Sequence, residues 1–147
     1  MTSIGERIKA HSAKAREQRI LLPVPDSDVS LLCRTLTQEE ISTCHNLGER
    51  IGRRDSAKVS RVVSRALLAV GTLEIWYGDE AWSDDSGRPL TFDDDQVHSV
   101  LEVADRLDAV QGVVGRDGDI DVMAKALMRE SGFRFFDDDY QAGDPPT

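Results

Sequence analysis

Two short apolar runs on either side of a turn sequence constrain the fold of this chain more than any other feature. Apolar residues occupy alternate positions of residues 20–24 and again of residues 29–33, which indicates strands with one buried face. Between them lies Pro-Asp-Ser-Asp at positions 25–28, a sequence of turn formers. The segment therefore predicts a β-hairpin. Pro23 cannot donate a ladder hydrogen bond, so we expect the first strand to lie at a sheet edge.

A helix-start sequence follows the hairpin. Thr37 and Glu40 have the spacing of a capping box, in which the hydroxyl and the carboxylate each accept a hydrogen bond from a free backbone N–H group. We expect this helix to begin near Gln38 and to end near Gly48 or Gly52. Residues 55 and 56, Asp-Ser, then offer an N-cap for a second helix.

The second helix is predicted to have an apolar face and a basic face. Apolar residues recur from position 59 at steps of three and four, which indicates a buried stripe of Val59, Val62, Val63, Ala66, Leu67 and Val70. At about 100° per residue the opposite side collects basic residues into one narrow line. Three interpretations are open for this line: a solvated helix face, a contact with an acidic surface of this chain or of a partner, or a contact with phosphate. As a candidate partner-binding surface it consists of Arg50, Arg54, Lys58, Arg61 and Arg65.

The remainder of the chain continues as a connection and two helices. Residues 71–95 mix aromatic and β-branched residues with turn formers, which predicts an irregular connection or a second hairpin. Acidic residues 93–95 precede a predicted helix whose apolar face comprises Val97, Val100, Leu101, Ala104, Leu107 and Val110. A last helix has a seam of Ile120, Met123, Ala124 and Leu127 and stops at Ser131-Gly132.

Both ends of the chain differ from its centre. Residues 1–18 predict a basic arm or a weak, mostly polar helix, and residues 19–132 a single α+β domain. Residues 133–147 form an aromatic and acidic tail, which is either a last packed segment or an exposed peptide that docks elsewhere. Its aromatic residues are further candidate partner-binding positions: Phe133, Phe135, Phe136 and Tyr140. The predicted fold is an N-terminal hairpin packed on three or four helices, with extended termini.

The charge of the chain is divided unevenly. The net charge is −9, but residues 1–65 hold 12 Lys and Arg against 8 Asp and Glu (+4), and residues 66–147 hold 6 against 19 (−13). We expect the two halves to attract each other, and the acidic total disfavours nonspecific binding to nucleic acid. No apolar run approaches the length of a membrane span or of a signal peptide, which favours a cytosolic location without a membrane partner.

Candidate chemistry is sparse. Asp117, Asp119 and Asp121 have the spacing that opens a calcium loop, but the sixth position is Val122 and the twelfth is Met128, so we expect helix-capping and turn roles instead.

The other reactive residues are no better placed. Neighbouring Cys44 and His45 would point about 100° apart on a helix, and we expect Cys44 and Cys33 to stay reduced. His11 and His98 lack partners at zinc-ligand spacing. Acidic residues 84, 85 and 93–95 are read as turns and caps rather than as an acid–base pair. We therefore expect no catalytic residue, no metal and no cofactor.

The order of these parts resembles a known family. Arg34–Glu40 reads RxLTxxE and Ser86–Phe92 reads SGRPLTF, beside LPVP, VSLLCRTLT and SRALLAVGTLEI. With the hairpin and the final short helix, residues 15–132 resemble the short form of the tail assembly chaperones of long-tailed phages that infect actinobacteria.

The resemblance implies a non-enzymatic protein of the host cytoplasm. It would coat the phage tape-measure protein, keep the long apolar helix of that protein soluble and recruit the tail-tube protein; self-association stays open. One alternative is a structural virion protein, either a head–tail connector or a minor tail subunit, which would use edge strands and arms to lock neighbours together. The other is a small regulator that binds nucleic acid through the basic line.

Overall fold

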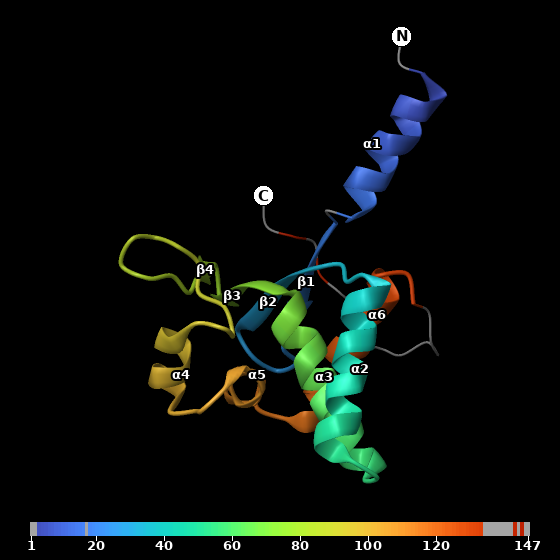
Figure 1. Ribbon diagram of the computed structural model, residues 1–147. Coiled ribbons are helices and arrows are strands. Elements are labelled where there is room, and N and C mark those ends of the chain that lie inside the picture. The colour runs from blue at the N-terminus through green and yellow to red at the C-terminus, as the bar shows by residue number, and fades with distance from the viewer. Residues whose placement is uncertain (1–2, 17, 134–142, 144, 146–147) are drawn as a thin grey trace.

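The structure is a computed structural model that describes residues 3–16, 18–133, 143 and 145 (Figure 1). The described chain is α+β, as predicted. Its helices are α1 (Ile4–Arg16), α2 (Gln38–Gly52), α3 (Ser56–Gly71), α4 (Asp95–Leu101), α5 (Arg106–Val114) and α6 (Asp117–Glu130). Its strands are β1 (Arg19–Pro23), β2 (Val29–Arg34), β3 (Thr72–Tyr77) and β4 (Glu80–Ala81).

The four strands form one antiparallel sheet in the order β1-β2-β3-β4. The predicted hairpin is β1 and β2, and β1 is the outer strand, as Pro23 indicated. The second hairpin, β3 and β4, turns at Gly78, whose φ of +63° suits glycine. Leu31 of β2 pairs with Ile75 of β3, so the two hairpins join into a sheet that is larger than the one predicted.

Helices α2 and α3 begin where the sequence indicated. Thr37 Oγ1 accepts a hydrogen bond from the Glu40 N–H at 3.2 Å, and Glu40 Oε1 accepts one from the Thr37 N–H at 3.0 Å, which is the predicted capping box. Asp55 caps α3 by accepting a bond from the Lys58 N–H at 3.2 Å. The helix break between them, at Gly52, separates α2 from α3.

The predicted helix after residue 95 is wrong in one respect, because it is two helices. Glu102 adopts a left-handed conformation with φ of 57° and ends α4. Asp105 then caps α5 by accepting a hydrogen bond from the Asp108 N–H at 2.9 Å. As a result Val100, assigned to a buried face, has an exposed fraction of 63%.

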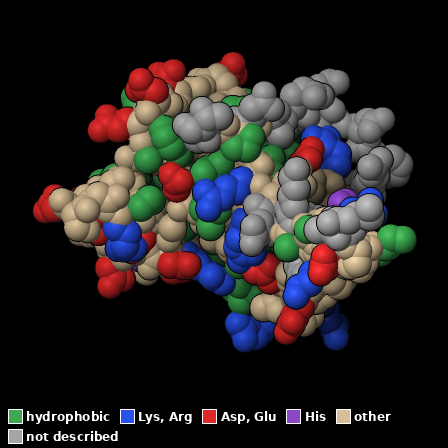
Figure 2. Space-filling view, turned by 90° about the horizontal axis from the view of Figure 1, so that it is seen from above, with side chains coloured by type: hydrophobic (Ala, Val, Ile, Leu, Met, Phe, Trp, Pro, Cys, Tyr) green, Lys and Arg blue, Asp and Glu red, His purple; other side chains and the backbone are tan. Residues whose placement is uncertain are grey.

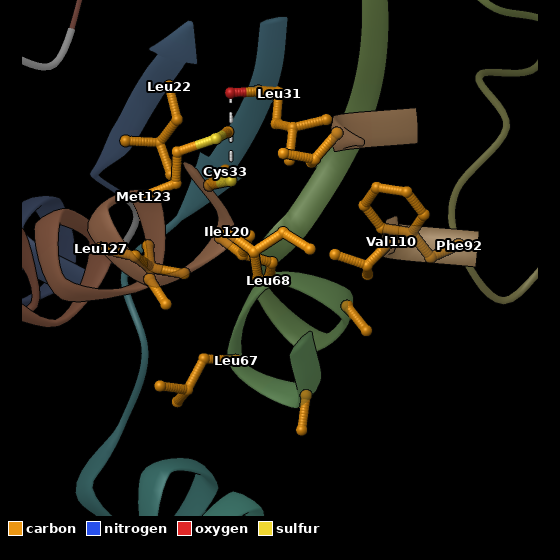
Figure 3. Packing of buried hydrophobic residues seen from close by; sticks show 14 of the residues in the cluster. Leu22, Leu31, Cys33, Leu67, Leu68, Phe92, Val110, Ile120, Met123 and Leu127 are labelled. Atoms are coloured by element: carbon orange, nitrogen blue, oxygen red, sulfur yellow. Dashed lines mark hydrogen bonds between the residues drawn. The ribbon is translucent and has the colours of Figure 1, made fainter. Parts of the chain in front are cut away.

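The core lies between one face of the sheet and helices α3, α5 and α6 (Figure 3). The predicted seam of α6 is buried there, and Figure 3 shows Ile120, Met123 and Leu127 among the residues of this cluster. Full burial of a Leu, Ile or Met side chain such as these contributes about 1.5–3 kcal/mol. Both cysteines are free and buried, as expected for reduced thiols, and burial raises the pKa of the Cys33 thiol to about 12.

The structure describes part of each end of the chain. α1 is a helix that extends away from the body, and its Ile4 and Ile8 side chains have exposed fractions of 71% and 60% (Figure 1). Phe133 is half-buried against the core. Phe135, Phe136 and Tyr140 lie outside the described residues, so their predicted role stays a prediction.

An ion pair joins the end of β2 to the start of α2. Arg34 Nη1 and Nη2 donate to the two carboxylate oxygens of Glu40 at 2.9 and 2.6 Å. These bonds favour the ionised carboxylate, and they lower the pKa of Glu40 from 4.5 to about 2. A carboxylate with a lowered pKa adds stability above its ordinary pKa, and that stability is lost as the pH falls toward the lowered value.

We predict that Glu40→Gln lowers the free energy of unfolding by about 1–2 kcal/mol near neutral pH, because the charge-assisted pair is lost while the amide can still cap. The difference between variant and wild type should close as the pH falls from 4.5 to 2, as measured by urea unfolding. Glu39→Gln, an exposed neighbour in the same turn, is the control and should cost little. A difference in the free energy of unfolding that stays constant with pH would contradict a stabilising role of the ionised Glu40 carboxylate.

Candidate partner-binding groove

A groove of about 640 Å³ runs along α3, with α2 on one side and α6 on the other. α2 and α6 each pack on α3, and the face of α3 between them forms the floor. The apolar floor and inner walls consist of Val59, Val63, Leu67, Ala124 and Met128. The charged or ionisable rim consists of His45, Glu49, Arg53, Arg54, Asp121 and Lys125. A hollow with an apolar floor and a polar rim is the usual form of a binding site.

Two glycines of α2 allow this arrangement. A Cβ atom at Gly48 would collide with the Val63 side chain, and one at Gly52 would lie 2.6 Å from the Val59 backbone nitrogen. The two helices therefore approach closely at this end, which leaves Val59 half-buried rather than covered by a long side chain. The predicted apolar stripe of α3 thus serves both the core, through Ala66, and the groove, through Val59.

The α6 wall carries charges that are already paired. Lys125 Nζ lies 2.9 Å from Asp121 Oδ2, and Ser64 Oγ donates to Asp121 Oδ1 at 3.2 Å. The other end of the groove differs, since Arg53 and Arg54 have no ion pair within the part of the chain that the structure describes. The groove is therefore apolar along its length and cationic at the α2–α3 turn.

The predicted line of five basic residues is wrong as a single helical face. The line assumed a continuous helix, but α2 ends at Gly52 and α3 begins at Ser56. Arg50 consequently lies on α2, Arg54 in the turn, and the other three on α3. Of the five, Arg54 lines the groove, next to Arg53, which sequence reasoning missed.

Arg65 makes contacts within the chain. It donates to Asp117 at 3.1 Å and to Gln111 at 2.9 Å, and it lies 3.8 Å from Asp108. Its side chain is only 18% exposed. Arg65 thus links α3 to α5 and α6, which is the expected attraction between the basic and acidic halves. Partner binding by Arg50, Lys58 and Arg61 stays a prediction.

The acidic residues whose contacts are described stabilise turns and form ion pairs within the chain. Asp84 accepts hydrogen bonds from the backbone N–H groups of Ser86 and Arg88, as expected for a turn residue. Asp94 accepts one from the Thr91 N–H, and Arg88 bridges Asp84 and Asp94.

The predicted place of Asp117 and Asp119 at a helix start is confirmed, but the predicted side-chain cap is wrong, because no side chain caps α6. Asp117 and Asp119 lie in its first turn, where the helix dipole favours a negative charge. Within residues 3–16 and 18–133, no three His, Cys, Asp or Glu side chains come close enough together to hold a metal ion.

Charged and apolar side chains gather in different places on the face of the molecule that Figure 2 shows. Figure 2 shows Asp and Glu side chains along the side that carries β4 and α4, and Lys and Arg side chains toward the middle and lower edge of the view. Hydrophobic side chains are visible between them. None of the described helices combines the length and the apolar character that a membrane crossing requires.

The comparisons with known proteins add no relative. The chain matches no protein-family model, and neither the curated proteins nor the solved structures contain a significant match to it. The groove and its charges are therefore the basis for a functional proposal.

We predict that Arg65→Gln lowers the free energy of unfolding by about 1–2 kcal/mol, because Asp117 and Gln111 lose a largely buried partner. Arg61→Gln, four residues earlier on α3 and exposed, should change it by less than about 0.5 kcal/mol. The free energies of unfolding of the two variants are compared by chemical denaturation. Equal losses in both variants would show that Arg65 is not an internal link.

Proposed function

We propose that the protein is a non-enzymatic assembly factor that binds an amphipathic helix of another protein in the groove between α2, α3 and α6. The observation that carries this proposal is the apolar floor beside a cationic end. The resemblance of the sequence to phage tail assembly chaperones names the partners: the client would be the tape-measure protein, and the tail-tube protein would be recruited to the complex.

The dimensions of the floor suit a helix. Val59, Val63 and Leu67 follow one another at intervals of four residues, and eight residues of α3 span about 12 Å at 1.5 Å per residue. That length accommodates two turns of a docked helix, which would place apolar side chains at positions i, i+3 or i+4 and i+7.

The cationic end of the groove would determine the direction in which a helix docks. Arg53 and Arg54 would attract acidic side chains, or the partial negative charge at the C-terminus of a helix. The apolar floor would supply most of the contact with the client, and the charged groups at the rim would increase the rate of association. Both properties suit a factor that must bind and later release its client. The excess of negative charge elsewhere on the chain opposes aggregation of the unoccupied factor.

One observation favours the structural virion protein as the second candidate. α1 extends from the body with exposed apolar side chains, which is the form of an arm that holds a neighbour. A virion component would be retained in purified particles, whereas a chaperone would be absent from them.

We predict that Val59→Lys weakens binding to a tape-measure helix by about tenfold or more, because an ammonium group buried by the client replaces apolar contact on the floor. Arg53→Glu with Arg54→Glu should weaken it through repulsion at the acidic end of the client. The measurements are the soluble yield of the client on co-expression and the dissociation constant by titration.

Val100→Lys is the matched control, since it places the same charge on an exposed valine of α4, away from the groove. Circular dichroism establishes that each variant is folded. Wild-type affinity in folded Val59→Lys would refute binding in this groove.

A further inference from the structure

α1 presents an apolar stripe that no described part of the chain covers. Ile4 and Ile8 lie one turn apart on the same side of the helix, with exposed fractions of 71% and 60%. At about 100° per residue, Arg7 and Lys9 flank this stripe on opposite sides. The helix sequence holds four Lys and Arg against one Glu. Exposed apolar side chains between basic residues suit an apolar surface with an acidic rim.

The body of the same protein has such a surface where β2 begins and β3 ends. A hollow of about 370 Å³ is lined by Val29, Ile75, Trp76, Tyr77, Trp82, Gly112 and Val113. Tyr77 is 69% exposed. Val29 pairs with Tyr77, and Ile75 lies two residues before Tyr77, so these side chains share the face of the sheet that carries the hollow, whereas the Trp76 side chain points to the other face.

Acidic residues that adjoin the lining in the two hairpins make up the rim of this hollow. Asp28 precedes Val29, Asp79 lies in the turn between β3 and β4, and Glu80 begins β4 opposite Tyr77. All three are exposed, and none forms an ion pair with any residue that the structure describes. Asp and Glu side chains also predominate on the side of the molecule that carries β4 (Figure 2). These acids are opposite in charge to Arg7 and Lys9 of α1, which likewise form no ion pair with any described residue.

We propose that α1 of one copy docks in the hollow of a second copy, with Ile4 and Ile8 against Tyr77 and Trp82. Only residues 17 and 18 separate α1 from β1, so the helix leaves the sheet at the end where Arg19 pairs with Arg34. The hollow lies at the opposite end, where Val29 pairs with Tyr77. The helix would have to reverse within two residues to reach the hollow of its own chain. Reciprocal exchange of the two arms closes a two-fold dimer.

This inference uses neither α2 nor the floor of the groove on α3, so it stands or falls independently of the proposed function. The first experiment is light scattering of the full chain over a range of concentrations. The mass should rise with concentration from 16.3 kDa toward twice that value. Ile4→Ser with Ile8→Ser should leave the chain monomeric. Val100→Ser, the same kind of change at an exposed valine of α4, should not alter the dimer.

The second experiment exchanges the charges. Arg7→Glu with Lys9→Glu, and separately Asp79→Lys with Glu80→Lys, should each prevent self-association, because arm and rim then carry the same sign. An equimolar mixture of the two variants should dimerise, since each arm meets a rim of opposite charge. The fluorescence of Trp76 and Trp82 should change on mixing and in no variant alone.

Three outcomes would overturn the proposal. The first is a wild-type chain that stays monomeric at every concentration. The second is a monomer whose tryptophan fluorescence depends on Ile4 and Ile8, which would place α1 on its own chain. The third is a monomer that binds vesicles containing phosphatidylserine through α1, which would assign the arm to a membrane surface.

Discussion

The structure depends on the burial of α3. Ala66, Leu67 and Leu68 are almost completely buried, and α3 contacts α2, α5, α6 and the sheet. Much of that contact is close packing, since Gly48 and Gly52 bring the α2 backbone against Val59 and Val63. The same helix forms the floor of the groove because α2 and α6 cover its two sides and leave the strip between them open. The core and the candidate site are thus two faces of one helix.

The contacts that α3 and its neighbours make within the chain determine which charged groups beside the groove are paired. Arg65 is directed to Asp117, Gln111 and Asp108, so its charge joins helices within the chain. Lys125 is likewise paired with Asp121 on the α6 wall. The unpaired basic groups beside the groove are consequently those at the α2–α3 turn, where a partner can reach them. Pairing within the fold, more than the number of basic residues, therefore decides which charges can act in recognition.

Local signals in the sequence predicted much of the fold. The hairpin, the capping box of Thr37 and Glu40 and the α6 seam all depend on residues close together in the chain, and each has one strong physical cause. The errors have causes of a different kind. The break at Glu102 requires a left-handed residue that carries no distinctive sequence signal, although Asp105 marks the next cap. The pairing of β3 with β2 joins segments about forty residues apart, and the groove exists only once α2 and α6 are placed on α3. Arg54 was found because it is basic, but its position beside Arg53 at the end of the groove depends on where α2 ends.

A helix that docks in the groove should change the NMR signals of the methyl groups that line the groove. The most direct measurement is a titration of the full chain, labelled at its Val, Leu and Met methyl groups, with a synthetic amphipathic helix that carries acidic residues at its C-terminal end. The predicted result is that the largest shifts occur at Val59, Val63, Leu67 and Met128 and saturate together. Saturable shifts confined to Val29 and Val113 beside the aromatic hollow, with the resonances of Val59 and Met128 unchanged, would contradict it.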